Sequence, residues 1–209
     1  RIPSSLDESP RARLNLVMEL VLGSSSPYRQ AQLKTLGYAF NTEAPGIDEA
    51  AQRGEEPLEL ATRLAGEKAL VTAQRHPSAV VIGADQVAVV GTSILSKPLT
   101  VARAIGQLRT LSGQRVDFLS AICVIEPIGR THSHVEETKV LFRDLEIETI
   151  EQYVALDQPL DCAGGFRSEG LGVHLIEQVE SSDPSALIGL PLIALSKILR
   201  TVGIDPLRN

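Results

Sequence analysis

From residue 19 to residue 202, short apolar runs with the character of β-strands alternate with longer segments that have the character of helices. This alternation is typical of α/β folds, in which helices cover a sheet built partly from parallel strands. The expected strands span residues 19–22, 79–84, 116–125, 133–142 and 173–179. The expected helices span residues 27–36, 57–75, 100–111, 146–156 and 191–202. We therefore predict an α/β fold with a mixed, twisted β-sheet flanked by helices.

Local signals mark several of these boundaries. Ser26 and Pro27 supply an N-cap and a first-turn proline for the first helix, and Gly37 is placed to terminate it. The two longest expected strands are predicted to be antiparallel neighbours across a turn near Gly129. Helix starts and tight turns are thus indicated by residues close to them in the sequence.

The chain has 209 residues, of which 43% are hydrophobic, enough for one sizeable core. We expect a single domain over residues 18–209. Residues 1–17 are polar and irregular and precede the only methionine, Met18, so we expect them to be a mobile extension. We find no apolar run long enough to cross a bilayer and no secretion signal, and we expect a cytoplasmic protein.

Charge and cysteine content exclude some classes of function. A net charge of −6 disfavours a general nucleic-acid binder, which needs a basic surface for the phosphates. A small phosphorylated ligand remains compatible if a few cations or a metal ion are placed locally. Cys123 and Cys162 lack the spacing of a zinc site or a disulfide framework, so we expect both to be core thiols.

The segment LVLGSSSPYR is the first candidate binding site. It takes a buried strand through a turn of small residues into a helix that begins at Pro27. Helix N-termini attract anions, the small side chains of Ser24 and Ser26 permit close approach of a phosphate, and Arg29 adds a full charge. Either Arg29 faces an anionic ligand, or it points into solvent above a well-capped helix.

Lys68 is a second candidate, because it shares a helical row with Leu60 and Leu64 that should face the core. A lysine on such a row either extends its ammonium group to the surface or reaches into a cleft. Both interpretations fit the spacing.

Asp85 follows the apolar run AVVIGA, where the strand is expected to end. Ligands of open α/β sheets bind beyond the carboxyl ends of the strands, so a carboxylate at this point is a good functional candidate. The alternative is an aspartate that caps the next turn. Lys97 comes 12 residues later, and Pro98 holds it in an extended conformation.

Two further acidic segments could serve a site. Asp48 and Glu49 lie in the loop APGIDEA and could donate oxygen ligands to a hard divalent cation, although acidic loops are common. Glu169 lies beside flexible glycines in CAGGFRSEG, where the backbone can approach a ligand closely.

Eight segments in order complete the pattern: SSSPYR, IDE, EKA, GADQV, SKPLT, LSG, AGGFRSEG and GLPL. With them the chain resembles the Maf family of nucleoside triphosphate pyrophosphatases from Met18 to the final helix. The resemblance implies that Asp85 is the proton acceptor, that Arg29, Lys68 and Lys97 bind phosphate, and that Glu49 belongs to a metal-associated acidic loop.

The resemblance also implies which base is preferred. The positions that determine base preference fall on Tyr28, Gln86 and Glu169, whereas the branch acting on dTTP and UTP typically has Arg, Thr and Gln there. The chain is therefore similar to the branch that prefers 7-methyl-GTP. Glu169 could accept the two adjacent donors of guanine, and the positive charge of the methylated purine favours stacking on Tyr28.

The hypothesis from sequence is hydrolysis of 7-methyl-GTP to 7-methyl-GMP and pyrophosphate, with a divalent metal cation, Mg²⁺ or Mn²⁺, as cofactor. Asp85 would either deprotonate the attacking water or bind the metal alongside Glu49. The alternatives are a dTTP/UTP pyrophosphatase and a non-catalytic nucleotide-binding regulator of cell division. The expected partners are a small nucleotide and a second copy of the chain, with neither nucleic acid nor membrane.

Overall fold

The computed structural model describes residues 18–208, so the expected extension over residues 1–17 lies outside the described part. Within that part, one mixed seven-stranded sheet has the order β2-β1-β3-β5-β6-β7, with β4 paired to β3. The strands are β1 (Leu20–Gly23), β2 (Asn41–Glu43), β3 (Val80–Val90), β4 (Ser93–Leu95), β5 (Arg115–Ile125), β6 (Thr131–Phe142) and β7 (Ile176–Glu180). The predicted mixed sheet is confirmed, since β2, β1 and β3 are parallel and the remaining pairs are antiparallel.

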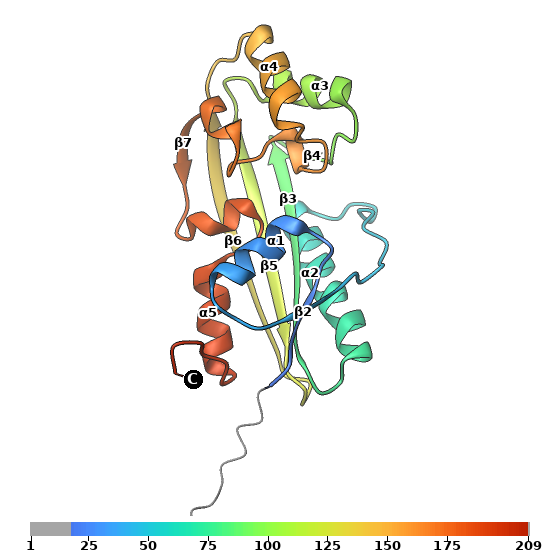
Figure 1. Ribbon diagram of the computed structural model, residues 1–209. Helices are drawn as coiled ribbons and strands as arrows, with labels where there is room; N and C mark the ends of the chain where they lie inside the picture. Colours follow the sequence, from blue (N-terminus) through green and yellow to red (C-terminus); the bar gives the residue numbers. More distant parts are fainter. Residues whose placement is uncertain (1–17, 209) are drawn as a thin grey trace, which may run out of the picture.

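Helices gather around both ends of the long strands (Figure 1). The α-helices are α1 (Pro27–Thr35), α2 (Pro57–Arg75), α3 (Val101–Leu111), α4 (Ile147–Asp157) and α5 (Leu192–Thr201). Three 3₁₀ helices complete the described part: η1 (Ala163–Gly165), η2 (Leu171–Leu175) and η3 (Pro184–Ile188). The five predicted α-helices are confirmed, with ends that differ by one residue at most.

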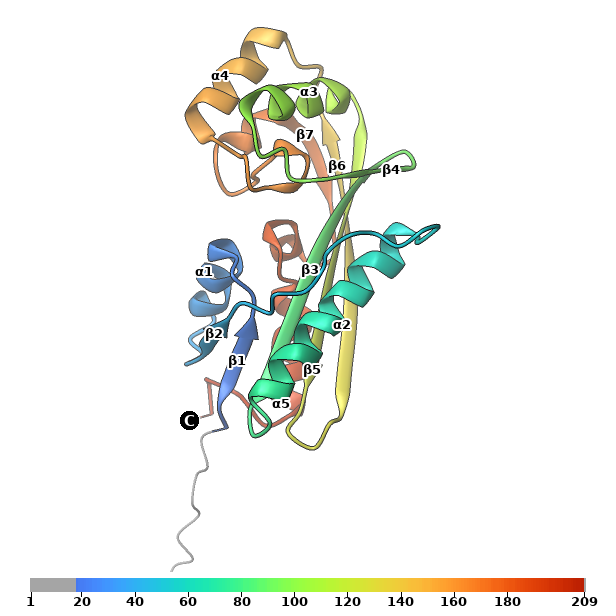
Figure 2. The ribbon, with the colours of Figure 1, turned by 90° about the vertical axis from the view of Figure 1, so that its right-hand side faces the viewer.

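The long strands β3, β5 and β6 run through the molecule and connect its two ends, which are covered by different helices (Figure 2). At one end, α2 packs on one face of β1 and β3, while α1 and α5 pack on the other face. At the other end, α3 and α4 cover a core that includes Phe118, Phe142 and Phe166. The start of β3 is apolar on both faces because helices cover both.

The expected end of the strand at residue 84 is wrong, because β3 continues to Val90. The antiparallel partner β5 pairs with it along its whole length, and Asp85 lies opposite Ala121. On the other side, β1 stops at Gly23, which pairs with Gly83, and β4 pairs only from Ala88 onward. Asp85 therefore lies where β3 has lost one neighbouring strand, although β3 itself does not end there.

Two further differences concern short elements. The strand expected over residues 173–179 starts later, at Ile176, because the preceding residues form η2. The three-residue strand β2 was not expected, since Asn41–Glu43 is polar and too short to show a period. Pairing with β1, rather than any local preference, makes this segment a strand.

Candidate active site

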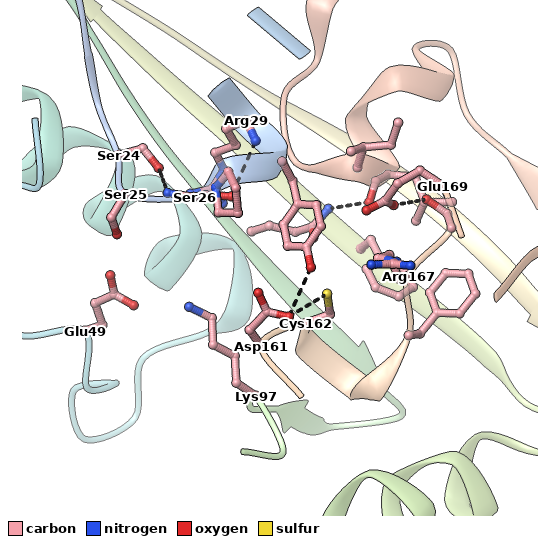
Figure 3. Close-up of a pocket in the computed structure, with 18 of the residues that line it drawn as sticks. Ser24, Ser25, Ser26, Arg29, Glu49, Lys97, Asp161, Cys162, Arg167 and Glu169 are labelled. Atoms are coloured by element: carbon pink, nitrogen blue, oxygen red, sulfur yellow. Dashed lines mark hydrogen bonds between the residues drawn. The ribbon is translucent and has the colours of Figure 1, made fainter. Parts of the chain in front are cut away.

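A cavity of about 280 Å³ opens between the two ends of the molecule. Both ends contribute to it. One end provides the start of α1 and Lys68 of α2, and the other provides the segments after β4 and around η1 (Figure 3). Its polar and charged lining consists of Ser24, Ser25, Ser26, Tyr28, Arg29, Glu49, Lys68, Gln86, Lys97, Asp161, Cys162, Arg167, Ser168 and Glu169. The structure thus brings nearly all the candidates from sequence together in one place.

Lys68 reaches into the cleft rather than to the surface. Its side chain is buried, and its ammonium nitrogen lies 2.6 Å from Oδ1 of Asp85 and 2.6 Å from Oε1 of Glu49. Asp85 is buried as well, and it meets the cavity through this lysine. Two carboxylate oxygens from distant segments therefore converge on one point.

The close approach of α2 to the sheet explains how Lys68 reaches Asp85. A methyl group at Gly83 would lie 2.2 Å from the carbonyl oxygen of Ala65 and 2.4 Å from the backbone nitrogen of Ala69. No side chain larger than hydrogen fits there, so α2 rests directly on β3 one turn from Lys68.

Arg29 lines the cavity and does not point freely into solvent. Its guanidinium donates to the carbonyl oxygens of Ala84, at 3.0 Å, and Gly189, at 3.2 Å. Ala84 belongs to the stretch of β3 that has lost its neighbour, so Arg29 takes the place of a strand partner. Burial lowers the pKa of Arg29, and the charges of Asp85 and Glu49 oppose this shift.

The serine turn prepares the start of α1 for an anion. Ser26 caps the helix by accepting from the backbone N–H of Arg29, and buried Ser24 accepts from that of Ser26. Pro27 has no N–H, and that of Tyr28 has no partner within residues 18–208. One first-turn donor therefore stays available beside the cavity.

Of the two carboxylates that Lys68 contacts, that of Glu49 is more exposed than that of Asp85. Burial would raise the pKa of its carboxyl group, but the hydrogen bond and charge of Lys68, with Lys97 and Arg29, outweigh burial and hold the pKa below its ordinary value. Asp48 turns away, since its carboxylate accepts from the backbone N–H of Ala50 and does not line the cavity.

Gln86 lines the cavity, but its amide nitrogen forms hydrogen bonds only with other parts of the protein. That nitrogen donates to Ser120 Oγ at 2.9 Å and to the carbonyl oxygens of Ala186 and Leu187 in η3, at 3.0 and 3.1 Å. The amide oxygen has no hydrogen-bond partner in the described part of the chain. A ligand would therefore meet Gln86 as an acceptor.

Tyr28 crosses the cavity to the opposite wall. Its hydroxyl group donates to Oδ1 of Asp161 at 3.2 Å. Burial, with the nearby Cys162 and Asp161, raises the pKa of Tyr28 to about 12 despite a hydrogen bond with Arg167 that lowers it. The hydroxyl group thus stays a donor at neutral pH.

The segment that precedes Glu169 is held in place by contacts with β6 and α4. Phe166 packs edge-on against Phe142, with ring centroids 5.1 Å apart. The backbone N–H of Arg167 donates to the hydroxyl of Tyr153, and its guanidinium pairs with buried Asp157. Glu169 itself is open to solvent on one side, and partial burial raises its pKa against the lowering effect of Arg167.

Lys97 is exposed beside the cavity, and no carboxylate in the described residues forms an ion pair with it. The expectation that Cys162 is a core thiol is wrong, because its half-buried thiol lines the cavity and donates to Asp161 at 3.6 Å. Cys123 is buried as expected.

Sequence reasoning did not single out Asp161 or Arg167. Arg167 lies in the glycine-rich stretch that contains Glu169, and Asp161 directly precedes that stretch, so an acidic and a basic residue near the glycines were the available signals. Their partners, Tyr28 and Asp157, lie far away in the sequence or on another element, and only the fold pairs them.

Glu49 and Asp85 can bind a divalent cation only if a ligand supplies further oxygen atoms. Within residues 18–208, no group of three or more metal-binding side chains occurs. Glu49 and Asp85 nevertheless direct oxygens at one point, which the Lys68 ammonium group occupies. Mg²⁺ commonly binds one or two carboxylates and completes its shell with water and substrate phosphates, so the residues fit such an ion.

A model of the family described as "Maf-like protein" matches residues 19–202. Three similar proteins are each named 7-methyl-GTP pyrophosphatase. That of Nitrosococcus oceani is 48% identical over 88% of this chain and 93% of its own. Those of Alcanivorax borkumensis and Bordetella avium are 45% and 46% identical over 89% and 91% of this chain, and 95% and 96% of their own.

Among solved structures, a nucleoside-triphosphatase or dITP/XTP pyrophosphatase of Mycobacterium abscessus has a TM-score of 0.42 and 17% identity. The match covers 61% of this chain and 76% of that one. We infer nothing from so distant a likeness. Separately, no helix among residues 18–208 has the length and apolar character needed to cross a membrane.

Proposed function

The chain belongs to the Maf family, and from this premise we propose that it hydrolyses 7-methyl-GTP to 7-methyl-GMP and pyrophosphate. The observation that carries the proposal is the cavity in which Lys68 holds Asp85 and Glu49 together, with Arg29 and Lys97 on its walls. Three cations beside two carboxylates suit a polyphosphate, and relatives named for 7-methyl-GTP support the base.

Asp85 acts on the attacking water. Its carboxylate accepts the proton as the water oxygen bonds to the α-phosphorus, and the bond from that phosphorus to the bridging oxygen of the β-phosphate breaks. The departing pyrophosphate takes both electrons of the broken bond. Asp85 suits this role because β3 places it beyond the end of β1, where Lys68 holds its carboxylate beside the cavity.

The cations neutralise charge on the phosphates. Arg29 is fixed by two carbonyl oxygens, so its remaining N–H groups are held in a set direction, whereas Lys97 is free to move toward the leaving group. Ser24, Ser26 and the free N–H of Tyr28 add donors at the start of α1. Lys68 keeps the two carboxylates in place until phosphate oxygens share its ammonium group.

A divalent cation, Mg²⁺ or Mn²⁺, held by Glu49 and Asp85 would offset the negative charge of the phosphates. Its site would be completed by the substrate, as the donor set of two carboxylates requires. The enzyme should therefore bind metal weakly alone and more tightly with nucleotide.

The base lies toward the opposite wall. Tyr28 offers an aromatic face, Glu169 can accept two adjacent N–H donors of guanine, and the amide oxygen of Gln86 is a further acceptor. Uracil and thymine lack the adjacent donor pair. We also propose that the protein works in the cytoplasm, and that it forms a homodimer, as the family resemblance implies.

A substrate panel tests the proposal. Purified protein is incubated with Mg²⁺ and 7-methyl-GTP, GTP, dTTP or UTP in turn, and kcat/KM is measured for each. We expect 7-methyl-GTP to give the highest value. A preference for dTTP and UTP would contradict the proposed base, and binding of all four without hydrolysis would indicate a nucleotide-binding regulator instead.

A further inference from the structure

The wall of the cavity around η1 carries two carboxylates that no cation neutralises directly. Within residues 18–208, neither Asp161 nor Glu169 forms an ion pair. Arg167, which also lines the cavity, is paired with Asp157, which is buried. The wall is therefore negative at Asp161 and Glu169, whereas Arg29, Lys68 and Lys97 are the cations proposed to bind the phosphates.

Asp161 lies at the edge of the aromatic face proposed to hold the base. The hydroxyl of Tyr28 donates to Oδ1 of Asp161 at 3.2 Å, a contact that joins the start of α1 to the segment before η1 (Figure 3). Any ring stacked on Tyr28 thus has the Asp161 carboxylate beside it, at the hydroxyl end. No other aromatic ring is packed on Tyr28 in the described structure, and Tyr28 lines the cavity.

The charges of both carboxylates act on the same small volume. Burial raises the pKa of the Cys162 thiol to about 12, and the charges of both Asp161 and Glu169 add to the shift. The thiol of Cys162 also donates to Asp161 at 3.6 Å. A cationic group placed here would be stabilised by the same field that disfavours a thiolate.

We propose that Asp161 is a specificity-determining residue that selects a positively charged, N7-methylated purine over its neutral counterpart. This rests on the proposed function. Methylation at N7 gives the purine ring a positive charge and leaves its N1–H and amino donors in place, so Glu169 can pair with either base. Only the methylated ring gains from the second carboxylate, that of Asp161.

The substitution Asp161→Asn separates charge from hydrogen bonding, because asparagine still offers an oxygen to the Tyr28 hydroxyl. We expect kcat/KM for 7-methyl-GTP to fall about three- to tenfold while that for GTP changes less than about twofold. Asp144→Asn removes one charge from an exposed position that does not line the cavity, and it should leave both values unchanged. Tyr28→Phe, which keeps the charge and the ring, should preserve the ratio of the two values.

Equal losses for both nucleotides in Asp161→Asn, or no loss for either, would overturn the assignment. So would a Tyr28→Phe variant whose ratio falls as far as that of Asp161→Asn, since the hydrogen bond would then explain the effect. Calorimetric dissociation constants for 7-methyl-GMP and GMP provide a readout without turnover. If wild type hydrolyses neither triphosphate, the proposed function fails, yet loss of a binding preference in Asp161→Asn would still support Asp161.

Discussion

The two lysines of the cavity differ in how their charges are paired. Lys68 is bound on both sides by Asp85 and Glu49, whereas Lys97 has no carboxylate partner in the described chain. A buried ion pair costs desolvation that its attraction only partly recovers, so such a pair is better explained by function than by stability. Removal of one partner should therefore be tested with a shape-preserving substitution.

Asp85→Asn is that substitution for the proposed proton acceptor. We expect kcat to fall about 100- to 10,000-fold, because asparagine cannot accept the proton from water. Nucleotide affinity in the presence of Mg²⁺, measured by calorimetry, should persist if Asp85 acts as the base and should fall if it binds the metal. A variant with a near-normal rate would exclude both roles, provided its melting temperature matches that of wild type.

Cys162 makes a second residue-level prediction. Its pKa is raised to about 12 by burial and neighbouring carboxylates, so at pH 8 the thiol stays neutral and only a minute fraction is the reactive thiolate. Reaction with a disulfide reagent should be much slower than for a free cysteine at pH 8 and should accelerate as pH rises toward 12. Unfolding in denaturant should release both thiols at the ordinary rate, and rapid labelling of the folded protein would contradict the assigned environment.

At the scale of elements, the placement of α2 on β3 determines the geometry of the site. Lys68 lies between Ala65 and Ala69, the residues whose backbones contact Gly83. The contact is possible only because Gly83 has no side chain. The strand and helix would otherwise separate, and the lysine would withdraw from Asp85.

Gly83→Ala tests this packing. The added methyl group cannot fit, so we expect a loss of about 1–3 kcal/mol in the free energy of unfolding, together with reduced activity. Gly66→Ala is a matched control, because Gly66 lies in α2, the helix that packs on Gly83, with nothing near its added methyl group. That control should raise stability by about 0.5–1 kcal/mol. Equal effects in denaturant titrations would argue against close packing at Gly83.

The helices could be predicted well because their signals are local. Two helix starts were predicted from such signals, one at Ser26 and Pro27 and one at Thr100. In the structure Ser26 is the N-cap of α1 and Thr100 is the N-cap of α3. The end of β3 could not be predicted, since it depends on pairing with β5, which lies some 30 positions further along the chain. Asp85 was thus found for a reason only partly correct: its place beside the cavity follows from the end of β1 and not from the end of its own strand.

For the molecule as a whole, the site exists only where its two ends meet. The phosphate-binding candidates could be predicted from motifs, but Asp161 and Arg167 could not, because their contacts with Tyr28 and Asp157 arise from folding. A nucleotide bound between the ends should therefore stabilise both at once. This favours a single cooperative unfolding transition that shifts with ligand concentration.

That shift can be measured with an analogue of 7-methyl-GTP whose α,β-bridging oxygen is replaced by methylene. At 100 times its dissociation constant, with Mg²⁺, it should add about 2.7 kcal/mol to stability. For a protein of this size the melting temperature should rise by about 5–10 °C. The corresponding dTTP analogue at the same concentration should produce a smaller rise. Equal shifts would mean that the cavity does not distinguish the bases.

The position of bond cleavage tests the central claim most directly. Turnover of 7-methyl-GTP in water enriched in ¹⁸O labels whichever phosphorus the water attacks, and mass spectrometry of the products locates the label. Attack at the α-phosphorus, as proposed for water activated by Asp85, predicts one ¹⁸O in 7-methyl-GMP and none in pyrophosphate. Label in pyrophosphate, or orthophosphate as the first product, would contradict it.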